Sequence, residues 1–487
     1  MLSADNSVLY TAFKAKDTRF DGRFFVGIST TGIYCRPVCR AKQPKLENCT
    51  FYPTAAEAEQ AGYRPCLLCR PELAPGASIT DATAMLVHRA ARILEENCGS
   101  NQSLNELAGR LGCTDRHLRR VFTTEYNVSP VQYLQTCRLL LAKNLLTDTN
   151  LSVLDVAMAS GFGSLRRFND LFKNHYRLSP TALRKSTPEE KKQDSKITLA
   201  LGYRPPYRFE DILNFLAARA IPGVEMATGK KYFRTVHMQD ADKKDVYGWL
   251  CIGHLPKKNA LTVTVSETLL PVLPQVLAKV RHLFDLYCDP DAVYETLSQM
   301  NNIRPDLCVL GTRLPGSFNA FEMAVRAVLG QQITVKAAKT LAARLAASYG
   351  KTLQTSIDGL THVFPSPVDI LALDGPIENY LGPIGIIATR ARTIRELAKA
   401  LEQGEIDLGI CAQPEIEMKK LMAIPGIGSW TAGYIAMRAM GWPDAFLETD
   451  AGIKKALEAC KPKELPKMAE EWRPWRSYAM INLWNSL

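Results

Sequence analysis

The sequence Leu421-Met-Ala-Ile-Pro425-Gly426-Ile427-Gly428-Ser429-Trp430-Thr-Ala-Gly-Tyr434 decides the fold of the C-terminal part of this chain. Pro425 ends a first helix, and Gly426 and Gly428 permit the positive φ angles of a tight hairpin. Ser429 is a favourable N-cap for a second helix that begins directly after it. The free N–H groups at such a helix start can bind a phosphate. The stretch therefore predicts a helix-hairpin-helix that contacts DNA through its two glycines; the alternative is an ordinary loop between core helices.

The motif and its flanks resemble the DNA glycosylase superfamily, in which a carboxylate follows the hairpin. Asp450 fills that place and precedes a helical pattern, Ala-Gly-Ile-Lys-Lys-Ala-Leu. A carboxylate at a helix N-terminus is stabilised in its charged form. The resemblance implies that Asp450 stabilises an oxocarbenium-like sugar while the bond to a purine breaks, and that it orients or deprotonates the attacking water. Glu448 is the rival carboxylate, and a helix cap alone is the other role open to Asp450.

The stretches Trp472-Arg-Pro-Trp475-Arg-Ser-Tyr-Ala and Arg313-Leu314-Pro-Gly resemble the 3-methyladenine DNA glycosylase II (AlkA) family, and the resemblance spans residues 197–487. It implies that the base pocket is lined by Trp430, Tyr434 and Trp475. It also implies that Leu314 wedges into the duplex. An aromatic pocket attracts a cationic alkylated purine. Strand-cutting relatives carry lysine where Trp430 stands, which implies hydrolysis without strand cleavage. Core packing is the alternative role for each aromatic side chain.

Composition favours a DNA-binding protein with several domains. The chain has 487 residues, 46% of them hydrophobic, and a net charge of +11, which favours a polyanionic partner. We find no signal-peptide pattern and no apolar run long enough to span a bilayer. Thirteen cysteines without an export signal indicate a reducing cytoplasm. We therefore expect a cytoplasmic, nucleoid-associated bacterial protein with no membrane partner.

Two cysteine pairs near the N-terminus have the spacing of a zinc site. They are Cys35-Arg-Pro-Val-Cys39 and Cys66-Leu-Leu-Cys69. Short internal spacing within each pair is typical of tetrahedral Zn²⁺ coordination, so we expect one zinc ion held by all four cysteines. A disulfide is a weak alternative in a reducing compartment. A purely structural zinc site is the serious one.

The surroundings of these cysteines, Thr30-Thr-Gly-Ile-Tyr-Cys-Arg-Pro37 and Gly62-Tyr-Arg-Pro-Cys66, resemble the N-terminal domain of the Ada alkylation-response family. The resemblance implies that Cys35 irreversibly takes a methyl group from a DNA methylphosphotriester. Zinc with four thiolates carries a charge of −2 and methylation leaves −1, so repair would strengthen DNA binding. The resemblance also implies three contacts to the DNA backbone, from Thr31, Lys42 and Arg64. Relatives often have arginine at Lys42, where lysine loses bidentate geometry.

A duplicated helical pattern follows. Residues 104–112 and 153–161 each predict a short helix ended by glycine, and each is followed by a basic second helix, at 115–122 and 164–173. This duplication resembles the AraC family of transcription regulators. The arginines of the second helices could read guanine or bind phosphate, namely Arg116, Arg119, Arg166 and Arg167. A solvated basic face on an ordinary helical domain is the alternative.

We therefore expect a multidomain, mainly α protein: a small zinc-bound α+β domain, an AraC-type double helix-turn-helix domain, an α+β subdomain with strands near Ile197, Tyr232 and Leu261, and an all-helical helix-hairpin-helix domain. The expected boundaries are 1–77, 78–185, a linker at 186–196, 197–305 and 306–487. The expected function joins methyl acceptance, promoter binding and hydrolytic excision of alkylated purines such as 3-methyladenine. The alternatives are an activator with an inactive glycosylase-like DNA-binding module, and an N-terminal half that only tethers the enzyme. The expected partners are double-stranded DNA and RNA polymerase, for a monomer.

Overall fold

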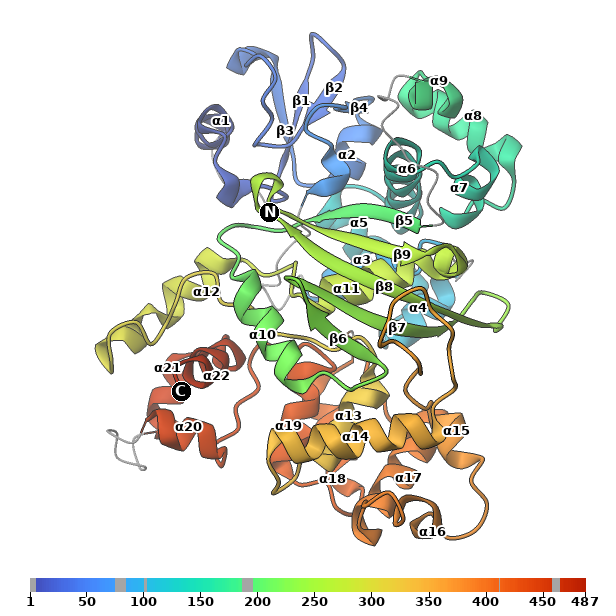
Figure 1. Ribbon diagram of the computed structural model, residues 1–487. Coiled ribbons are helices and arrows are strands. Elements are labelled where there is room, and N and C mark those ends of the chain that lie inside the picture. The colour runs from blue at the N-terminus through green and yellow to red at the C-terminus, as the bar shows by residue number, and fades with distance from the viewer. Residues whose placement is uncertain (1–5, 75–84, 100–102, 186–195, 411, 458–464) are drawn as a thin grey trace. The chain divides into compact units, whose positions relative to one another are not determined.

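The computed structural model describes residues 6–74, 85–99, 103–185, 196–410, 412–457 and 465–487 (Figure 1). The predicted linker lies outside these ranges except for Lys196. The chain forms two compact units: unit 1 comprises Met1–Pro205, Met238–Val246 and Leu255–Ala278, and unit 2 comprises Pro206–His237, Tyr247–His254 and Lys279–Leu487. No helix within the described ranges has both the length and the apolar character needed to cross a bilayer.

The first segment of unit 1 is a small sheet with two helices: α1 (Asn6–Ala15), β1 (Phe25–Ile28), β2 (Ile33–Cys35), β3 (Cys49–Tyr52), α2 (Ala55–Gln60) and β4 (Arg64–Pro65). The strand order is β3-β1-β2-β4. β1 pairs antiparallel with β2 and β3, whereas β2 and β4 are parallel, with Tyr34 opposite Pro65. Because parallel strands run in the same direction, the next residues, Cys35 and Cys66, lie at the same edge of the sheet.

The second segment of unit 1 consists of helices: α3 (Met85–Glu96), α4 (Leu104–Arg110), α5 (Asp115–Tyr126), α6 (Pro130–Asp148), α7 (Val153–Ala159), α8 (Leu165–Tyr176) and α9 (Pro180–Lys185). α4 with α5 and α7 with α8 repeat one arrangement, as predicted. The turns within these pairs contain Gly112 and Gly161 at positive φ. Each second helix buries one stripe at i, i+4, i+8 spacing, formed by Leu118, Phe122 and Tyr126 in α5 and by Phe168, Phe172 and Tyr176 in α8.

Buried polar contacts connect the first segment to α6. Glu59 of α2 accepts hydrogen bonds from the hydroxyls of Tyr34 (3.0 Å) and Thr136 (3.2 Å), and Thr136 belongs to α6. Glu72 pairs with Lys143 of α6 at 2.6 Å, and both side chains are buried. Breaking such a pair leaves an uncompensated buried charge. The two segments therefore pack as one body within unit 1.

The contact at Glu59 should make stability depend on pH. Burial raises the pKa of Glu59 from its ordinary 4.5 to about 8. Its contribution to stability is therefore fully present below pH 4.5 and is lost as the pH rises through about 8. We expect Glu59→Gln, which cannot ionise, to raise the free energy of unfolding by on the order of 3 kcal/mol at pH 8 and little at pH 5. Denaturant unfolding at both pH values measures this.

The exposed Glu47 provides the matched control for that experiment. Glu47→Gln should change the free energy of unfolding by less than about 0.5 kcal/mol at either pH. An equal effect of Glu59→Gln at pH 5 and pH 8 would contradict the assigned protonation.

An α+β segment contributes to both units: β5 (Lys196–Gly202), α10 (Phe209–Arg219), β6 (Glu225–Thr228), β7 (Lys231–Gln239), β8 (Asp245–Leu255), β9 (Ala260–Ser266) and α11 (Leu273–Leu283). β5 pairs antiparallel with β9, and β6 with β7. β5, β7 and β9 were predicted from alternating β-branched residues. β6 and β8 were not, because β6 is only four residues long and two glycines interrupt the pattern of β8.

The remainder of unit 2 is mainly helical: α12 (Pro290–Leu297), α13 (Ala320–Leu329), α14 (Val335–Tyr349), α15 (Pro367–Leu371), α16 (Glu378–Leu381), α17 (Ala388–Glu402), α18 (Pro414–Ala423), α19 (Ser429–Arg438), α20 (Ala451–Ala456), α21 (Leu465–Glu471) and α22 (Arg476–Asn485) (Figure 1). Its core includes apolar residues of α13, α14, α17 and α19. Small residues such as Ala432 and Ala436 let neighbouring helices approach α19 closely. The predicted multidomain, mainly helical fold is confirmed.

Candidate functional site

The four cysteines of the first segment form one cluster. Their sulfur atoms all lie within 4.8 Å of one another. Cys35 ends β2 and Cys66 directly follows the paired strand β4. Cys39 follows Cys35, and Cys69 follows Cys66, each after a short turn. All four are free thiols, not disulfides. Four thiolate donors this close suit one tetrahedral Zn²⁺ ion, so the predicted zinc site is confirmed.

Polar groups of Arg36 hold the second cysteine loop. The Arg36 backbone N–H donates to Sγ of Cys69 at 3.3 Å, and its guanidinium donates to the Cys69 carbonyl at 3.1 Å. The same guanidinium forms a buried ion pair with Asp21. Cys35 is only 2% exposed, whereas Cys69 is half-buried. Exposure alone therefore does not single out Cys35 as the reactive sulfur.

Most of the predicted DNA contacts of unit 1 lie on the surface. Arg64 is the exception: it is half-buried, and its guanidinium donates to the Tyr176 carbonyl at 3.5 Å. Arg119 is paired with Asp115 at 3.0 Å. An exposed basic start on each second helix is where a helix-turn-helix meets the major groove. The exposed residues are Thr31, Lys42, Arg116, Arg119, Arg166 and Arg167.

The helix-hairpin-helix is present, with its hairpin at residues 424–428 between α18 and α19. Gly426 has φ +92°, and a Cβ there would lie 2.3 Å from Oγ1 of Thr393. Gly428 has an ordinary φ, and a Cβ there would meet nothing within 4 Å. The expectation that Ser429 caps the helix is wrong: Ser429 is its first residue, and the cap is Gly428 without a side-chain bond. The first amides of α19 therefore stay available to an anion.

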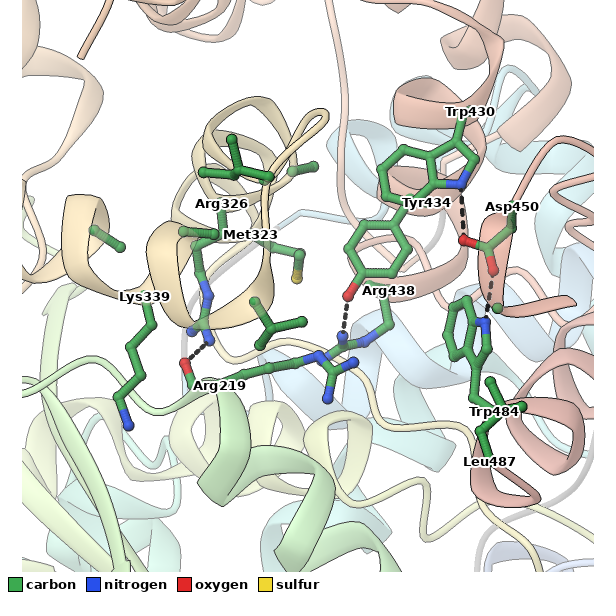
Figure 2. A pocket seen from close by; sticks show the side chains of 17 residues that line it. Arg219, Met323, Arg326, Lys339, Trp430, Tyr434, Arg438, Asp450, Trp484 and Leu487 are labelled. Atoms are coloured by element: carbon green, nitrogen blue, oxygen red, sulfur yellow. Dashed lines mark hydrogen bonds between the residues drawn. The ribbon is translucent and has the colours of Figure 1, made fainter. Parts of the chain in front are cut away.

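A cavity of about 420 Å³ lies beside α19 in unit 2 (Figure 2). Asp450 lines it and caps α20, because its Oδ1 accepts the backbone N–H of Ile453 at 3.1 Å. Two indole groups hold the same carboxylate: Nε1 of Trp430 donates to Oδ2 at 3.1 Å, and Nε1 of Trp484 donates to Oδ1 at 2.9 Å. Both tryptophans also line the cavity. The arrangement fixes one carboxylate at the edge of an aromatic pocket.

The pocket contains two of the three predicted aromatic side chains. Trp430 and Tyr434 stack with ring centroids 5.2 Å apart and planes 12° apart. Trp475 does not line the cavity; it is 6% exposed and packs edge-on against Tyr478. Trp484, near the end of α22, lies there instead. The sequence held one weak signal for Trp484, since a half-buried indole N–H needs an acceptor, but nothing identified Asp450 as that acceptor.

Two other predicted residues lie away from the pocket. Leu314 is 4% exposed, and its backbone N–H donates to Asp285 at 2.9 Å. Its side chain packs in the protein interior, and its role as a wedge in a duplex stays a prediction from the resemblance. Glu448, the rival carboxylate, is exposed and does not line the cavity. The loop that adjoins the hairpin contains Gln331, whose amide donates to the Gly426 carbonyl at 2.8 Å.

Models of four protein families match successive parts of the chain. They are the metal-binding domain of Ada at residues 8–72, a helix-turn-helix domain at 107–186, the AlkA N-terminal domain at 198–319, and the HhH-GPD superfamily of base excision DNA repair proteins at 325–473.

Individual relatives match the same parts. The "Probable bifunctional transcriptional activator/DNA repair enzyme AlkA" of Mycobacterium tuberculosis is 34% identical over 98% of this chain and 96% of its own length. The DNA-3-methyladenine glycosylase 2 of Escherichia coli is 36% identical over 58% of this chain and 95% of its own. The bifunctional transcriptional activator/DNA repair enzyme Ada of E. coli is 36% identical over 26% of this chain and 34% of its own.

Proposed function

The chain belongs to the family of bifunctional transcriptional activators and DNA repair enzymes named AlkA, and from this membership we propose how its residues act. As a member it accepts methyl groups from DNA methylphosphotriesters and hydrolyses the glycosidic bond of alkylated purines such as 3-methyladenine, without strand cleavage. DNA is its partner. The observation that carries the glycosylase assignment is the carboxylate of Asp450, fixed by two indole N–H groups beside an aromatic cavity.

Asp450 is proposed as the catalytic residue of the glycosylase. With the base between aromatic side chains and the sugar at the carboxylate, the negative charge stabilises the positive charge that develops on the sugar. The C1′–N bond breaks, and its electron pair leaves with the base. Water then adds to C1′ and gives its proton to Asp450 or to solvent. Trp430 and Trp484 position the carboxylate. Lys339 is the one lysine among the described residues that line this cavity, and it lies on the opposite side of the view from Asp450 (Figure 2).

Cys35 is proposed as the methyl acceptor, on the resemblance of its surroundings to the Ada family. Its sulfur attacks the methyl carbon of the phosphotriester, the S–C bond forms, the C–O bond breaks, and the electron pair stays on the phosphate. A bound zinc ion would keep the cysteine sulfur in its thiolate form at neutral pH. Cys39, Cys66 and Cys69 complete the cluster. We propose Thr31, Lys42 and Arg64 as contacts to the DNA backbone.

α5 and α8 are proposed as the promoter-reading helices, through Arg116, Arg119, Arg166 and Arg167. We also infer that the protein works as a monomer in the bacterial nucleoid and contacts RNA polymerase. The duplicated helix-turn-helix supports the monomer, because two recognition helices in one chain can occupy two half-sites without a second subunit. Light scattering of the protein alone and with polymerase tests both points. A stable dimer would contradict the first.

The hairpin glycines should separate folding from DNA binding. Gly426→Ala meets Thr393 and a positive φ, so it should lower the free energy of unfolding by about 1–2 kcal/mol. Gly428→Ala projects into open space, so the fold should be unchanged. A methyl group there obstructs the approach of a phosphate, and duplex affinity should fall roughly two- to fivefold. Fluorescence anisotropy and denaturant unfolding measure the two effects. Unchanged affinity in Gly428→Ala would remove the hairpin from the DNA contact.

One experiment tests the combined function against an activator that carries an inactive module. The intact protein is incubated with methylated duplex DNA, the released bases are separated chromatographically, and the cysteine peptides are weighed. We expect released 3-methyladenine and one methylated cysteine peptide. Methyl uptake without base release would leave only the regulator.

A further inference from the structure

The cavity at Asp450 contains more positive charge than a pocket for cationic bases requires. Four basic side chains line it with one carboxylate, Asp450. The basic residues are Arg219, Arg326, Lys339 and Arg438. A positively charged base would be repelled by unneutralised guanidinium groups that line the same cavity. Which of these charges is neutralised therefore decides what the pocket favours.

Arg326 is neutralised. Its guanidinium pairs with Glu225 at 2.7 Å and with Glu322 at 3.0 Å. Arg234 completes this buried group through its pair with Glu322 at 2.8 Å. These contacts connect β6, β7 and α13 within unit 2, and they account for the position of Arg326 without any ligand.

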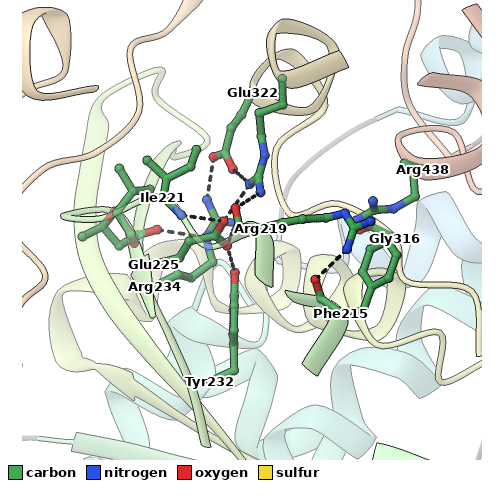
Figure 3. Close-up of polar contacts among 12 residues, drawn as sticks. Phe215, Arg219, Ile221, Glu225, Tyr232, Arg234, Gly316, Glu322 and Arg438 are labelled. Carbon is green, nitrogen blue, oxygen red and sulfur yellow. Dashed lines mark hydrogen bonds and ion pairs between the residues drawn. The ribbon is translucent and has the colours of Figure 1, made fainter. Parts of the chain in front are cut away.

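Arg438 differs from Arg326. It is 4% exposed, and none of the described carboxylates pairs with it. Its guanidinium donates to the carbonyls of Pro315 and Gly316 and to the hydroxyl of Tyr434 at 2.8 Å. Arg219 approaches from α10 and stacks 3.7 Å over the ring of Phe215 (Figure 3). The guanidinium groups of Arg438 and Arg219 both act on Tyr434, and in the described part of the chain no carboxylate pairs with either of them.

Tyr434 connects these guanidinium groups to the cavity, because its hydroxyl contacts Arg438 and its side chain lines the cavity. Its oxygen accepts from Arg438, and in the described part of the chain no acceptor takes its own proton. Burial by itself would raise the pKa of Tyr434, but the nearby guanidinium charges, Arg438 first and Arg219 second, outweigh it and lower the pKa below its usual value. A hydroxyl polarised in this way is a stronger hydrogen-bond donor. Because Tyr434 lines the cavity, a bound base is the acceptor within its reach.

We propose that Tyr434, polarised by Arg438, donates a hydrogen bond to the departing base and thereby allows this glycosylase to release neutral bases as well as cationic ones. The proposal rests on the proposed glycosylase function. A cationic base leaves as a neutral molecule and needs no such help, whereas a neutral base leaves with the electron pair of the C1′–N bond as an anion. The hydrogen bond stabilises that anion until it takes a proton from the water whose hydroxyl adds to C1′. Tyr434 is the catalytic residue in this step, and Arg438 is a positioning residue.

Two duplexes that differ only in the target base test the proposal under single-turnover conditions. One contains cationic 7-methylguanine and the other neutral hypoxanthine. Tyr434→Phe keeps the ring and removes the donor. We expect hypoxanthine release to slow by about tenfold more than 7-methylguanine release does, because only the neutral base depends on the donated hydrogen bond. Arg438→Lys, checked for folding by thermal unfolding, should shift the ratio of the two rates in the same direction.

Tyr349→Phe is the matched control, because its hydroxyl donates to the Tyr380 carbonyl at 2.6 Å outside the cavity, and both rates should be unchanged. Equal slowing of both bases by Tyr434→Phe would show a packing role and overturn the proposal. So would unchanged rates, or an intact protein that releases 7-methylguanine but no hypoxanthine. Release of neither base by the intact protein would overturn the glycosylase function together with this proposal.

Discussion

Asp450→Asn is expected to slow base release from methylated DNA by about 10³-fold while the protein stays folded. The substitution keeps the size of the side chain and an oxygen that can cap α20 through Ile453. It removes the negative charge that faces the developing positive charge on the sugar. It also turns an amide N–H₂ toward one of the two indole donors, so the carboxylate's fixed orientation is lost as well. Single-turnover release of 3-methyladenine measures the rate, and thermal unfolding confirms the fold.

Glu448→Gln is the control for that result. Glu448 is exposed, lies two residues from Asp450, and does not line the cavity. Its substitution removes the same charge from the same loop, so release should change by less than about twofold. If Glu448→Gln abolished release and Asp450→Asn did not, the catalytic carboxylate would be Glu448. Asp450→Asn should still bind duplex DNA, because the hairpin glycines are unchanged.

The parts of the site that could be predicted are those fixed by local spacing. The zinc cluster follows from two short cysteine loops, and the parallel pairing of β2 with β4 brings the loops together. Trp430 and Tyr434 are one helical turn apart, so their shared face was certain once the helix was. Asp450 was predicted from the resemblance to the glycosylase superfamily, in which a carboxylate follows the hairpin, and the structure places it at the start of α20 as expected.

The parts that could not be predicted depend on tertiary packing. Trp484 reaches Asp450 because the last turn of α22 packs beside α20, and nothing near Trp484 in the sequence indicates this. Trp475 was expected in the pocket on the strength of its motif, yet its ring is buried against Tyr478. Leu314 was expected as an exposed wedge only from the resemblance, whereas in the structure its side chain is buried and its backbone N–H donates to Asp285. Arg219 and Arg438 meet from helices far apart in the sequence.

Cys35→Ser is expected to abolish methyl uptake from methylphosphotriester DNA completely. A serine hydroxyl stays protonated at neutral pH and is a far weaker nucleophile than a thiolate. The three remaining thiolates should still hold zinc, though less tightly, because one of four donors is lost. Intact mass after incubation with methylated DNA measures the uptake, and zinc content of the same sample shows that the cluster has formed. Base release should be unaffected, because Asp450 and its partners all belong to unit 2.

Cys49→Ser is the matched control in the same segment. Cys49 is half-buried and lies outside the cluster, its thiol donates to the Lys45 carbonyl at 3.3 Å, and burial raises its pKa, so it stays protonated. Methyl uptake by Cys49→Ser should therefore equal that of the intact protein. Peptide mapping of the intact protein decides between the cluster cysteines. A methyl group on Cys69, the more exposed of the two residues, would move the acceptor role from Cys35 to Cys69 and overrule the resemblance on which Cys35 was chosen.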